Sequence, residues 1–297
     1  MDLTLDEFAA QVGADGPVTI AGSGSRGGAV PDVRTVSAPA GIERIDAAEM
    51  VVECGAATPV DELLTALAEH GQTVSLPAGG TVGGALAVGH SAVTRLGHGA
   101  MRDVLLQTRY VSAAGKLTKA GGPTVKNVSG FDLCRLFVGA RGTLGLFGDV
   151  ILRTRPVPRH SGWYTSDRDP SELLSDIYRP VALLWDGDAT HVRLDGDDAD
   201  IGVAVERFEL QEAAGPPALP GPYRWSVAPS MAIEAARSVA GSFVVELGVG
   251  VVHHSAPGEH HAPDVAKREL HDRIKQQFDP TGRLNPGVDP LAPPATR

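Results

Sequence analysis

The chain has 297 residues, of which 42% are hydrophobic, and this length allows about two domains with sizeable cores. Its 26 basic and 36 acidic side chains give a formal net charge of −10 at pH 7, which should repel nucleic acids and acidic membrane surfaces. No window approaches the ~20 apolar residues of a membrane span, and two cysteines are too few for an iron–sulfur cluster or a zinc knuckle.

Residues 1–156 are rich in glycine and predict an α+β unit. The clearest helix follows Thr58, which is expected to cap it, with Pro59 at its first position. Asp61 resembles the acid of a capping box, and Gly71 supplies the stop. The other expected elements are a helix over 6–12, strands over 17–21, 50–54 and 145–154, and a hairpin over 104–112 and 116–119.

Residues 160–262 contain fewer glycine loops and more aromatic and charged residues. Their alternation of strands and helices suggests a sheet covered by helices on one side. A helix is also expected over the tail, 264–278. Within 160–262, the predicted helices cover 171–178, 199–208 and 228–239. A hairpin is predicted over 181–185 and 190–194, a connector over 211–222, and a strand over 243–253 that Gly248 and Gly250 interrupt.

The loop Gly22 to Gly28 formally matches the dinucleotide fingerprint G-x-G-x-x-G. That fingerprint needs a helix at the loop, and Pro31 argues against one, so a Rossmann interpretation fails. The loop also lacks the Gly-Lys-Ser/Thr of a P-loop. Its small residues nevertheless expose several N–H groups, two hydroxyls and one guanidinium, which suits a pyrophosphate, although a plain surface loop explains it equally well.

Two further glycine clusters lie at 79–84 and 139–145. Glycine in a structural element costs about 1 kcal/mol relative to alanine, and this cost is tolerated where backbone must approach a ligand. Each cluster alone is also typical of a tight turn. Three such segments within 150 residues favour a shared ligand.

Several of these segments resemble a known family: GSGSRGGA at 22–29, SLPAGGTVGGALAVG at 75–89, HGAMRDVLL at 98–106, KNVSGFDLCRLFVGARGTLG at 126–145 and FDPTGRLNPG at 278–287. They are similar to the PCMH-type FAD-binding oxidases of the vanillyl-alcohol oxidase superfamily. The block containing Lys126, Asn127, Gly130 and Phe131 is most similar to the FAD-binding subunits of glycolate oxidases. The segment 245–254 is also similar to a strand of those subunits.

The resemblance implies an α+β fold with a two-part PCMH-type FAD-binding domain at 1–156. A smaller α+β cap domain follows at 157–262, and residues 263–297 return to the FAD domain. The cofactor would be FAD, held without a covalent bond because the first glycine loop contains neither histidine nor cysteine.

The family pattern assigns parts of the cofactor to the matching segments. The first loop would hold the pyrophosphate, 79–84 the flavin and ribityl chain, 143–145 the isoalloxazine edge, and Asn285 would close the site. The expected cofactor residues are Gly22, Ser23, Gly24, Ser25, Arg26, Gly27, Gly28, Gly79, Gly80, Thr81, Val82, Gly83, Gly84, Ser91, Arg95, Gly99, Gly142, Thr143, Leu144, Gly145 and Asn285.

The chain departs from the family at three places. Its first loop has Ser25-Arg26-Gly27 where many relatives have Gly-Thr-Lys. Residues 92–94 are Ala-Val-Thr where glycolate oxidase subunits usually show Gly-Pro-Arg. Arg141 stands where an acid or a neutral residue is frequent. These departures affect the detailed contacts of the first loop and of the segment after Ser91.

Oxidation of a hydroxy acid needs a base and a cation for the carboxylate. Arg26 and Arg102 are candidate cations. The family's histidine motif, with its Gly-Asp-Gly-Asn, is absent. The late histidines also lack the i,i+4 spacing of a metal site, so no metal is expected. A solvated loop near Pro257-Gly258 is the favoured interpretation of this segment. The candidate bases are His253, His254, His260 and His261.

The leading hypothesis is an FAD-binding subunit of a glycolate oxidase-like complex that oxidises glycolate or D-lactate beside a catalytic flavoprotein and an iron–sulfur subunit. With no cluster of its own, the chain would pass electrons to oxygen, a quinone or a partner. Its N-terminus lacks the features of a signal peptide, so we expect a cytoplasmic protein that meets the membrane's inner face only through partners. The alternatives are a stand-alone 2-hydroxy acid dehydrogenase, the FAD-carrying subunit of a molybdenum hydroxylase and a degenerate scaffold.

Overall fold

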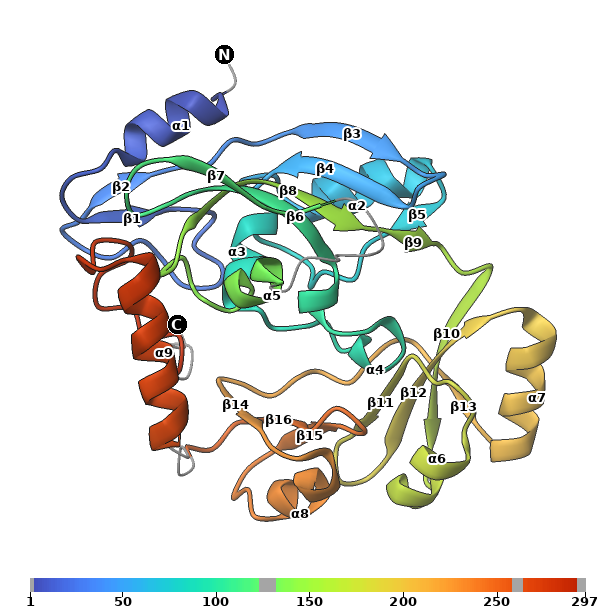
Figure 1. The fold of residues 1–297 in the computed structure, drawn as a ribbon. Helices are drawn as coiled ribbons and strands as arrows, with labels where there is room; N and C mark the ends of the chain where they lie inside the picture. The colour runs from blue at the N-terminus through green and yellow to red at the C-terminus, as the bar shows by residue number, and fades with distance from the viewer. Residues whose placement is uncertain (1–2, 123–131, 258–263, 293–297) are drawn as a thin grey trace. The chain divides into compact units, whose positions relative to one another are not determined.

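The computed structural model describes residues 3–122, 132–257 and 264–292. These residues form two compact units (Figure 1). The first contains 3–92, 101–122, 132–157 and 264–292, and the second contains 93–100 and 158–257. The expectations for Lys126, Asn127, Gly130, Phe131, His260 and His261 lie outside the described residues. None of the described helices is both long and apolar enough to cross a bilayer.

The first unit is built on a five-stranded antiparallel sheet (Figure 1). The hairpin β6–β7 confirms the predicted one, with Gly115 in its turn at φ +70°. Seven of the eight residues of β8 are buried, so this strand forms the middle of the core. In sheet order the strands are β3 (Ile42–Asp46), β4 (Val51–Gly55), β8 (Leu146–Arg153), β6 (Leu105–Val111) and β7 (Leu117–Gly121).

Most helices of the first unit bury apolar residues in the core around this sheet, and the helix over 265–278 contributes the partly buried Ile274 and Phe278. Helix α1 begins with a capping box between Thr4 and Glu7 and buries Phe8 and Val12. The others are α2 (Val60–Glu69), α3 (Val82–Val88), α5 (Leu133–Phe137) and α9 (Val265–Phe278), with α1 at Leu5–Val12 and a 3-10 turn, η1, at Met101–Asp103. The short strand pairs are β1 (Val18–Ile20) with β2 (Arg34–Val36) and β5 (Gln72–Thr73) with β9 (Arg155–Pro156).

The predicted start of α2 was wrong in its capping chemistry. The N-cap residue is Pro59, and no side chain caps the helix. The hydroxyl of Thr58 instead bonds the backbone of Gly41. The carboxylate of Asp61 accepts a hydrogen bond from Gly79 N–H at 3.0 Å, so both residues hold neighbouring loops rather than the helix end.

The second unit is built on a seven-stranded antiparallel sheet. In sheet order the strands are β13 (Gln211–Ala213), β10 (His160–Ser166), β12 (Thr190–Gly196), β11 (Ala182–Trp185), β15 (Phe243–Glu246), β16 (Val251–His254) and β14 (Tyr223–Ser226). The other elements are α4 (Arg95–His98), α6 (Pro170–Asp176), α7 (Asp198–Phe208), η2 (Pro229–Met231) and α8 (Ala232–Arg237).

Alternate residues of these strands face opposite sides, as the two-residue period of a strand requires. Leu183, Val192 and Val245 pack with residues of α6, α7 and α8 in one apolar cluster. Leu184 and Val244 belong to a separate, smaller cluster. Helices α6, α7 and α8 therefore lie on one side of the sheet, as expected. The segment 93–100, with the short helix α4, reaches the other side, where Val93 packs against Leu184 and Val244. We call this other side the Val244 face.

Three predicted elements of the second unit were wrong in detail. The strand expected over 243–253 is a hairpin, because Gly248 at φ +72° and Gly250 at φ +84° form its turn. The helix expected over 228–239 is divided into η2 and α8. The connector 211–222 begins with an edge strand, β13. The sequence division also placed nothing of this unit before residue 157, whereas residues 93–100 belong to it.

Candidate functional site

A cavity of about 300 Å³ lies in the first unit where three glycine-containing segments meet. They are the loop 22–28, the first turn of α3 and the turn at Arg141-Gly142, and Asn285 joins them from the C-terminal segment. The cavity is lined by Ile20, Ala21, Gly22, Ser23, Gly24, Ser25, Arg26, Gly27, Gly28, Ala38, Ala56, Ala57, Thr81, Gly83, Gly84, Ala87, Val88, Arg141, Gly142, Leu146, Phe147, Asn285 and Val288.

The loop 22–28 presents bare backbone to this cavity. Among the described residues, no hydrogen bond engages the backbone N–H groups of this loop. Gly24 and Gly27 have φ of +75° and +118°, which a residue with a side chain rarely adopts. The buried hydroxyl of Thr19 accepts a hydrogen bond from Val30 N–H at 3.0 Å and ties the two ends of the loop together. Consecutive free N–H groups held in this way form a binding site for an anion.

Arg26 joins this loop to the segment before α3. Its guanidinium donates to the carbonyl oxygens of Gly79 at 2.7 Å, Ala78 at 2.8 Å and Pro77 at 2.9 Å. Burial lowers the pKa of Arg26, while the nearby carboxylate of Asp61 acts to raise it. The geometry therefore gives Arg26 the role of a clamp between the loop 22–28 and the segment 77–79, with its donors already engaged by the chain.

Glycine at the start of α3 allows close contact between segments. A Cβ at Gly80 would collide with the Arg26 guanidinium and would lie 2.5 Å from Ser25 Oγ. A Cβ at Gly83 would lie 2.9 Å from the carbonyl oxygen of Ala56, which accepts the Gly83 N–H at 2.7 Å. Thr81 caps the helix by accepting from Gly84 N–H at 3.1 Å.

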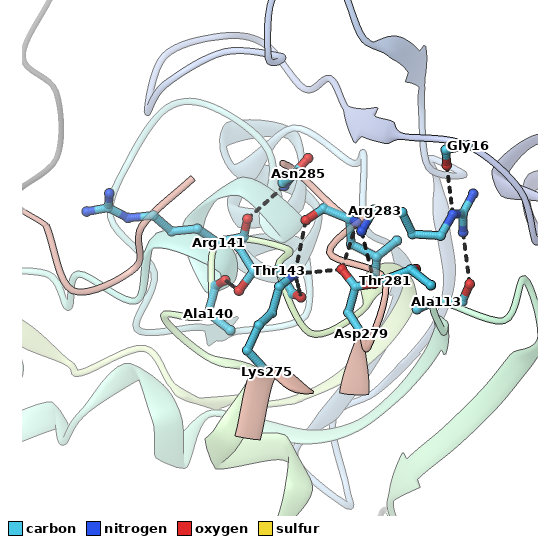
Figure 2. Close-up of polar contacts among 11 residues, drawn as sticks. Gly16, Ala113, Ala140, Arg141, Thr143, Lys275, Asp279, Thr281, Arg283 and Asn285 are labelled. Carbon is cyan, nitrogen blue, oxygen red and sulfur yellow. Dashed lines mark hydrogen bonds and ion pairs between the residues drawn. The ribbon is translucent and has the colours of Figure 1, made fainter. Parts of the chain in front are cut away.

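Asn285 connects the C-terminal segment to two walls of the cavity (Figure 2). Its amide nitrogen donates to the carbonyl of Arg141 at 2.7 Å, and its amide oxygen accepts from Ile20 N–H at 3.2 Å. Gly142, at φ +68°, faces this amide so closely that a Cβ would lie 2.6 Å from Asn285 Nδ2. The guanidinium of Arg141 in turn donates to the carbonyls of Asp289 and Ala292.

Buried polar groups hold Asn285 in place (Figure 2). The Asp279 carboxylate, 1% exposed, accepts from Lys275 Nζ at 2.6 Å and from Leu284 N–H at 2.8 Å. The guanidinium of Arg283, 5% exposed, donates to the carbonyls of Val12, Gly13, Asp15, Gly16 and Ala113. Leu284 pairs with Val18 of β1 as a parallel bridge. The C-terminal segment is therefore a fixed wall of the cavity.

Some expected cofactor residues do not line this cavity. Thr143 is buried, and its carbonyl accepts from Lys275 Nζ at 2.7 Å. A Cβ at Gly145 would lie 2.6 Å from the Tyr110 ring, so packing explains that glycine. Gly79, Gly80, Val82, Ser91, Thr143, Leu144 and Gly145 of the first unit, and Arg95 and Gly99 of the second, are outside the lining and stay predictions.

Most lining residues that the sequence did not indicate are small or apolar. Ala38, Ala56 and Ala57 are examples, and alanine carries no local signal of a binding role. Arg141 is the exception, because it was noted only as a departure from the family. Its φ of +48° is unusual for a residue with a side chain and marks the turn beside Gly142.

The two thiols and the one acidic cluster have structural explanations. Burial raises the pKa of Cys54 to about 12 and that of Cys134 to about 11, which leaves both thiols protonated and unreactive. Glu43, Glu53 and Asp149 converge on the guanidinium of Arg109. The arginine neutralises part of that charge, so the cluster gives no support for a metal.

The two described histidine candidates differ in their surroundings. His253 Nε2 lies 2.7 Å from Oε1 of Glu246, a carboxylate that is 3% exposed. His254 stacks on Tyr223 and contacts Trp225, and its Nδ1–H donates to the carbonyl of Ala256 at 2.8 Å. Only His253 of this pair has the carboxylate partner that a catalytic base commonly uses.

A family model described as an FAD binding domain matches residues 9–121. Glycolate oxidase subunit GlcE of Escherichia coli (strain K12) is 32% identical over 218 residues, which cover 67% of this chain and 61% of that protein. The D-lactate dehydrogenase of Archaeoglobus fulgidus is 35% identical over 145 residues, covering 46% of this chain and 32% of that protein. The chain thus spans less than two thirds of these relatives.

A solved structure of alkyldihydroxyacetonephosphate synthase superposes with a TM-score of 0.68 over 96% of this chain and 74% of that one, at 13% identity. At this identity the likeness concerns the fold, which confirms the expected α+β architecture. The domain match, the relatives and the fold together show that the chain belongs to the PCMH-type FAD-binding family, with FAD as its cofactor.

Proposed function

We propose that the chain is the FAD-binding subunit of a glycolate oxidase-like complex and that it takes part in oxidising a small 2-hydroxy acid, glycolate or D-lactate, at the CH–OH group. The observation that carries the proposal is the cavity of the first unit. Three separated segments of bare backbone converge there, with a fixed C-terminal wall.

The residues of the cavity fit FAD. Unpaired N–H groups of 22–28 suit the two phosphates, since backbone donors bind anions without requiring a counter-charge. Among the described residues that line the cavity, the charged ones are Arg26 and Arg141, and none is a carboxylate that would repel the phosphates. Leu146 and Phe147 offer apolar surface for the less polar parts of the cofactor.

Bound FAD supplies a two-electron acceptor for the carbon that carries the hydroxyl group. The chain's own residues shape the site around the cofactor and exclude water from it. Arg26 fixes the distance between two cofactor loops, and Asn285 fixes the turn at Gly142. None of the lining residues is histidine or cysteine, which supports non-covalent binding.

Electrons must leave the chain after the oxidation. The sequence contains two cysteines, and both are buried singly, so the chain cannot supply the four ligands of a typical cluster. Similarity to a protein named as a glycolate oxidase subunit supports transfer within a complex. A catalytic flavoprotein and an iron–sulfur protein are the partners we propose.

The second candidate function is a stand-alone 2-hydroxy acid dehydrogenase. The similarity to D-lactate dehydrogenase and the His253–Glu246 pair support it, because they suggest that the chain holds a base of its own. A non-catalytic scaffold subunit is the remaining alternative. It is supported by the missing family histidine motif.

The flavin spectrum of the purified chain tests the proposal. We expect a yellow protein that releases intact FAD on acid or heat denaturation. Anaerobic addition of glycolate or D-lactate should bleach the flavin when partner subunits are present. Bleaching by the chain alone would favour the stand-alone enzyme, whereas a colourless protein that ignores added FAD would contradict FAD binding and leave the scaffold.

A further inference from the structure

The Val244 face of the second unit's sheet carries an uncompensated group of basic side chains. Glu246 of β15, His253 of β16 and Arg224 of β14 lie on adjacent strands. The register places Arg224 opposite His253 and Glu246 opposite Val251, so the three charged side chains alternate onto the same side of the sheet as Val244. We call these three residues with Arg95 the basic cluster.

Helix α4 places Arg95 beside this cluster. Gly97 N–H donates to the carbonyl of Val181 at 3.1 Å, which fixes the helix against the sheet. The side chain of Leu96 reaches the β15–β16 turn, where a Cβ on Gly248 would lie 2.9 Å from its Cδ1. Val93, two residues before Arg95, packs against Leu184 and Val244, and the charge of Arg95 acts on Arg224. Arg95 is therefore held near the face that carries Glu246 and His253.

The charges of the basic cluster do not balance. Glu246 is the single acid, and its Oε1 is paired with His253 Nε2 at 2.7 Å. Within the described ranges, neither the Arg95 nor the Arg224 side chain has a hydrogen bond or an ion pair. Burial lowers the pKa of Arg224, and the charge of Arg95 lowers it further, while Glu246 acts in the opposite direction. Two half-buried guanidinium groups thus lack an anionic partner, which is costly unless a ligand supplies one.

We infer that Arg224 and Arg95 bind the carboxylate of a small organic acid, and that His253 accepts a hydrogen bond from the hydroxyl group of that acid. A guanidinium presents two parallel N–H groups that match a carboxylate. In the neutral tautomer whose Nε2–H donates to Glu246, His253 Nδ1 carries the lone pair that can accept. This inference rests on the proposed function and adds the residues that recognise a 2-hydroxy acid.

Binding of glycolate to the FAD-loaded chain tests the inference, with calorimetry as the readout so that no turnover is needed. Glycolamide, which has the same hydroxyl group but no charge, is the comparison ligand. Arg224→Met keeps the length of the side chain and removes its charge. We expect glycolate binding to weaken about tenfold or more in this variant, and glycolamide, already a poor ligand, to change little.

The matched control is Arg159→Met, on the same unit, because the Arg159 side chain is 85% exposed. It should leave glycolate binding unchanged. His253→Gln should abolish the preference for glycolate over acetate, which lacks the hydroxyl group, while acetate binding stays the same. Melting temperature and FAD content establish that each variant is folded.

Equal binding of glycolate by the parent chain and a folded Arg224→Met variant would overturn the inference, as would equal affinity of the parent chain for glycolate and glycolamide. If Arg224→Met does not fold, Arg95→Met carries the same test. The proposed function fails by a different result, namely absence of FAD binding or of flavin reduction by any 2-hydroxy acid. A yellow protein whose flavin is reduced by a 2-hydroxy acid, and which binds glycolate without Arg224, would therefore contradict this inference and leave the proposed function standing.

Discussion

The two units present different parts of the chain for binding. In the first, the loop 22–28 and Gly142 offer backbone, and the charged side chains nearby are engaged by carbonyl groups of the chain itself. In the second, Arg224 of β14 and Arg95 of α4 offer free side-chain charge. A backbone site should be sensitive to an added Cβ and tolerant of side-chain changes, whereas a side-chain site should show the reverse.

The largest effect should come from Gly142→Ala, which adds a single methyl group to the backbone site. The new Cβ would lie only 2.6 Å from Asn285 Nδ2 and would displace that amide. A φ of +68° is also strained for alanine. Backbone strain and two lost hydrogen bonds together cost about 3 kcal/mol. If this whole cost falls on binding, the dissociation constant of FAD rises on the order of a hundredfold. Fluorescence titration of the apoprotein with FAD measures this dissociation constant.

Gly287→Ala is the matched control for that prediction. Gly287 has φ +78° in the same C-terminal segment, does not line the cavity, and has open space where a Cβ would point. This variant should lose stability through strain but keep its affinity for FAD. Equal losses of FAD affinity in the two variants would mean that the segment's general rigidity, and not contact at Gly142, supports the site.

The next effect, in the second unit, concerns acid stability. Burial acts to raise the pKa of Asp195, but hydrogen bonds from His98, Ser161 and Arg193 outweigh burial and lower the pKa to about 2. A depressed carboxylate pKa stabilises the fold above its unfolded value near 4, and this contribution is lost as the pH falls from there towards 2. At neutral pH it amounts to roughly 2 kcal/mol.

Urea unfolding of the parent chain and Asp195→Asn between pH 6 and pH 2 measures this contribution. The difference in unfolding free energy between the two proteins should be largest above pH 5 and should shrink as the pH approaches 2. Because His98 belongs to the segment 93–100, the same variant should loosen that segment in hydrogen exchange. A difference that is constant with pH would contradict the role of Asp195.

A smaller effect is expected from Arg26→Met. It removes three hydrogen bonds to the carbonyls of 77–79 and frees the two cofactor loops from one another. We expect FAD binding to weaken about tenfold, with a slower association rate because the site is no longer preorganised. Arg34→Met is the control, since Arg34 holds the carbonyls of Val12 and Asp15 in the same unit and is not among the lining residues. Comparable weakening in both would refute the clamp.

The sequence predicted elements whose signals are local. The hairpin at 104–119 and the helix at 60–69 combine clear turns with regular apolar spacing. Helix α3 was missed because Gly83 and Gly84 disfavour a helix, by about 1 kcal/mol each, and tertiary contact with Ala56 overrides that preference. Strand β3 was missed because Glu43 and Arg44 are adjacent charged residues, which break the two-residue alternation of a strand at an edge bulge.

The same distinction applies to the site. Glycine density indicated the loop 22–28 and part of the α3 start, because excess glycine is costly without a reason. The alanines of the cavity wall carried no such signal, and the glycine at 145 also has a packing reason, since a Cβ there would lie 2.6 Å from the Tyr110 ring. Of the basic cluster, the sequence indicated Arg95 and His253 but not Arg224 or Glu246, because these two join them only through the order of strands β15, β16 and β14.

The smallest effect should be that of Ser23→Ala, and it tests the comparison most directly. The Ser23 hydroxyl bonds only Ser25 among the described residues, at 3.1 Å, while its backbone N–H belongs to the free set of the loop. If backbone groups bind the phosphates, removing this hydroxyl should change the FAD dissociation constant by less than about threefold. Such a change corresponds to a free energy below the ~1 kcal/mol of an ordinary hydrogen bond. Replacing Gly24, at φ +75°, by alanine in the same loop should cost far more. A Ser23→Ala loss that matches the Gly24→Ala loss would mean that side-chain hydroxyls bind the phosphates, and the contrast between the two units would no longer hold.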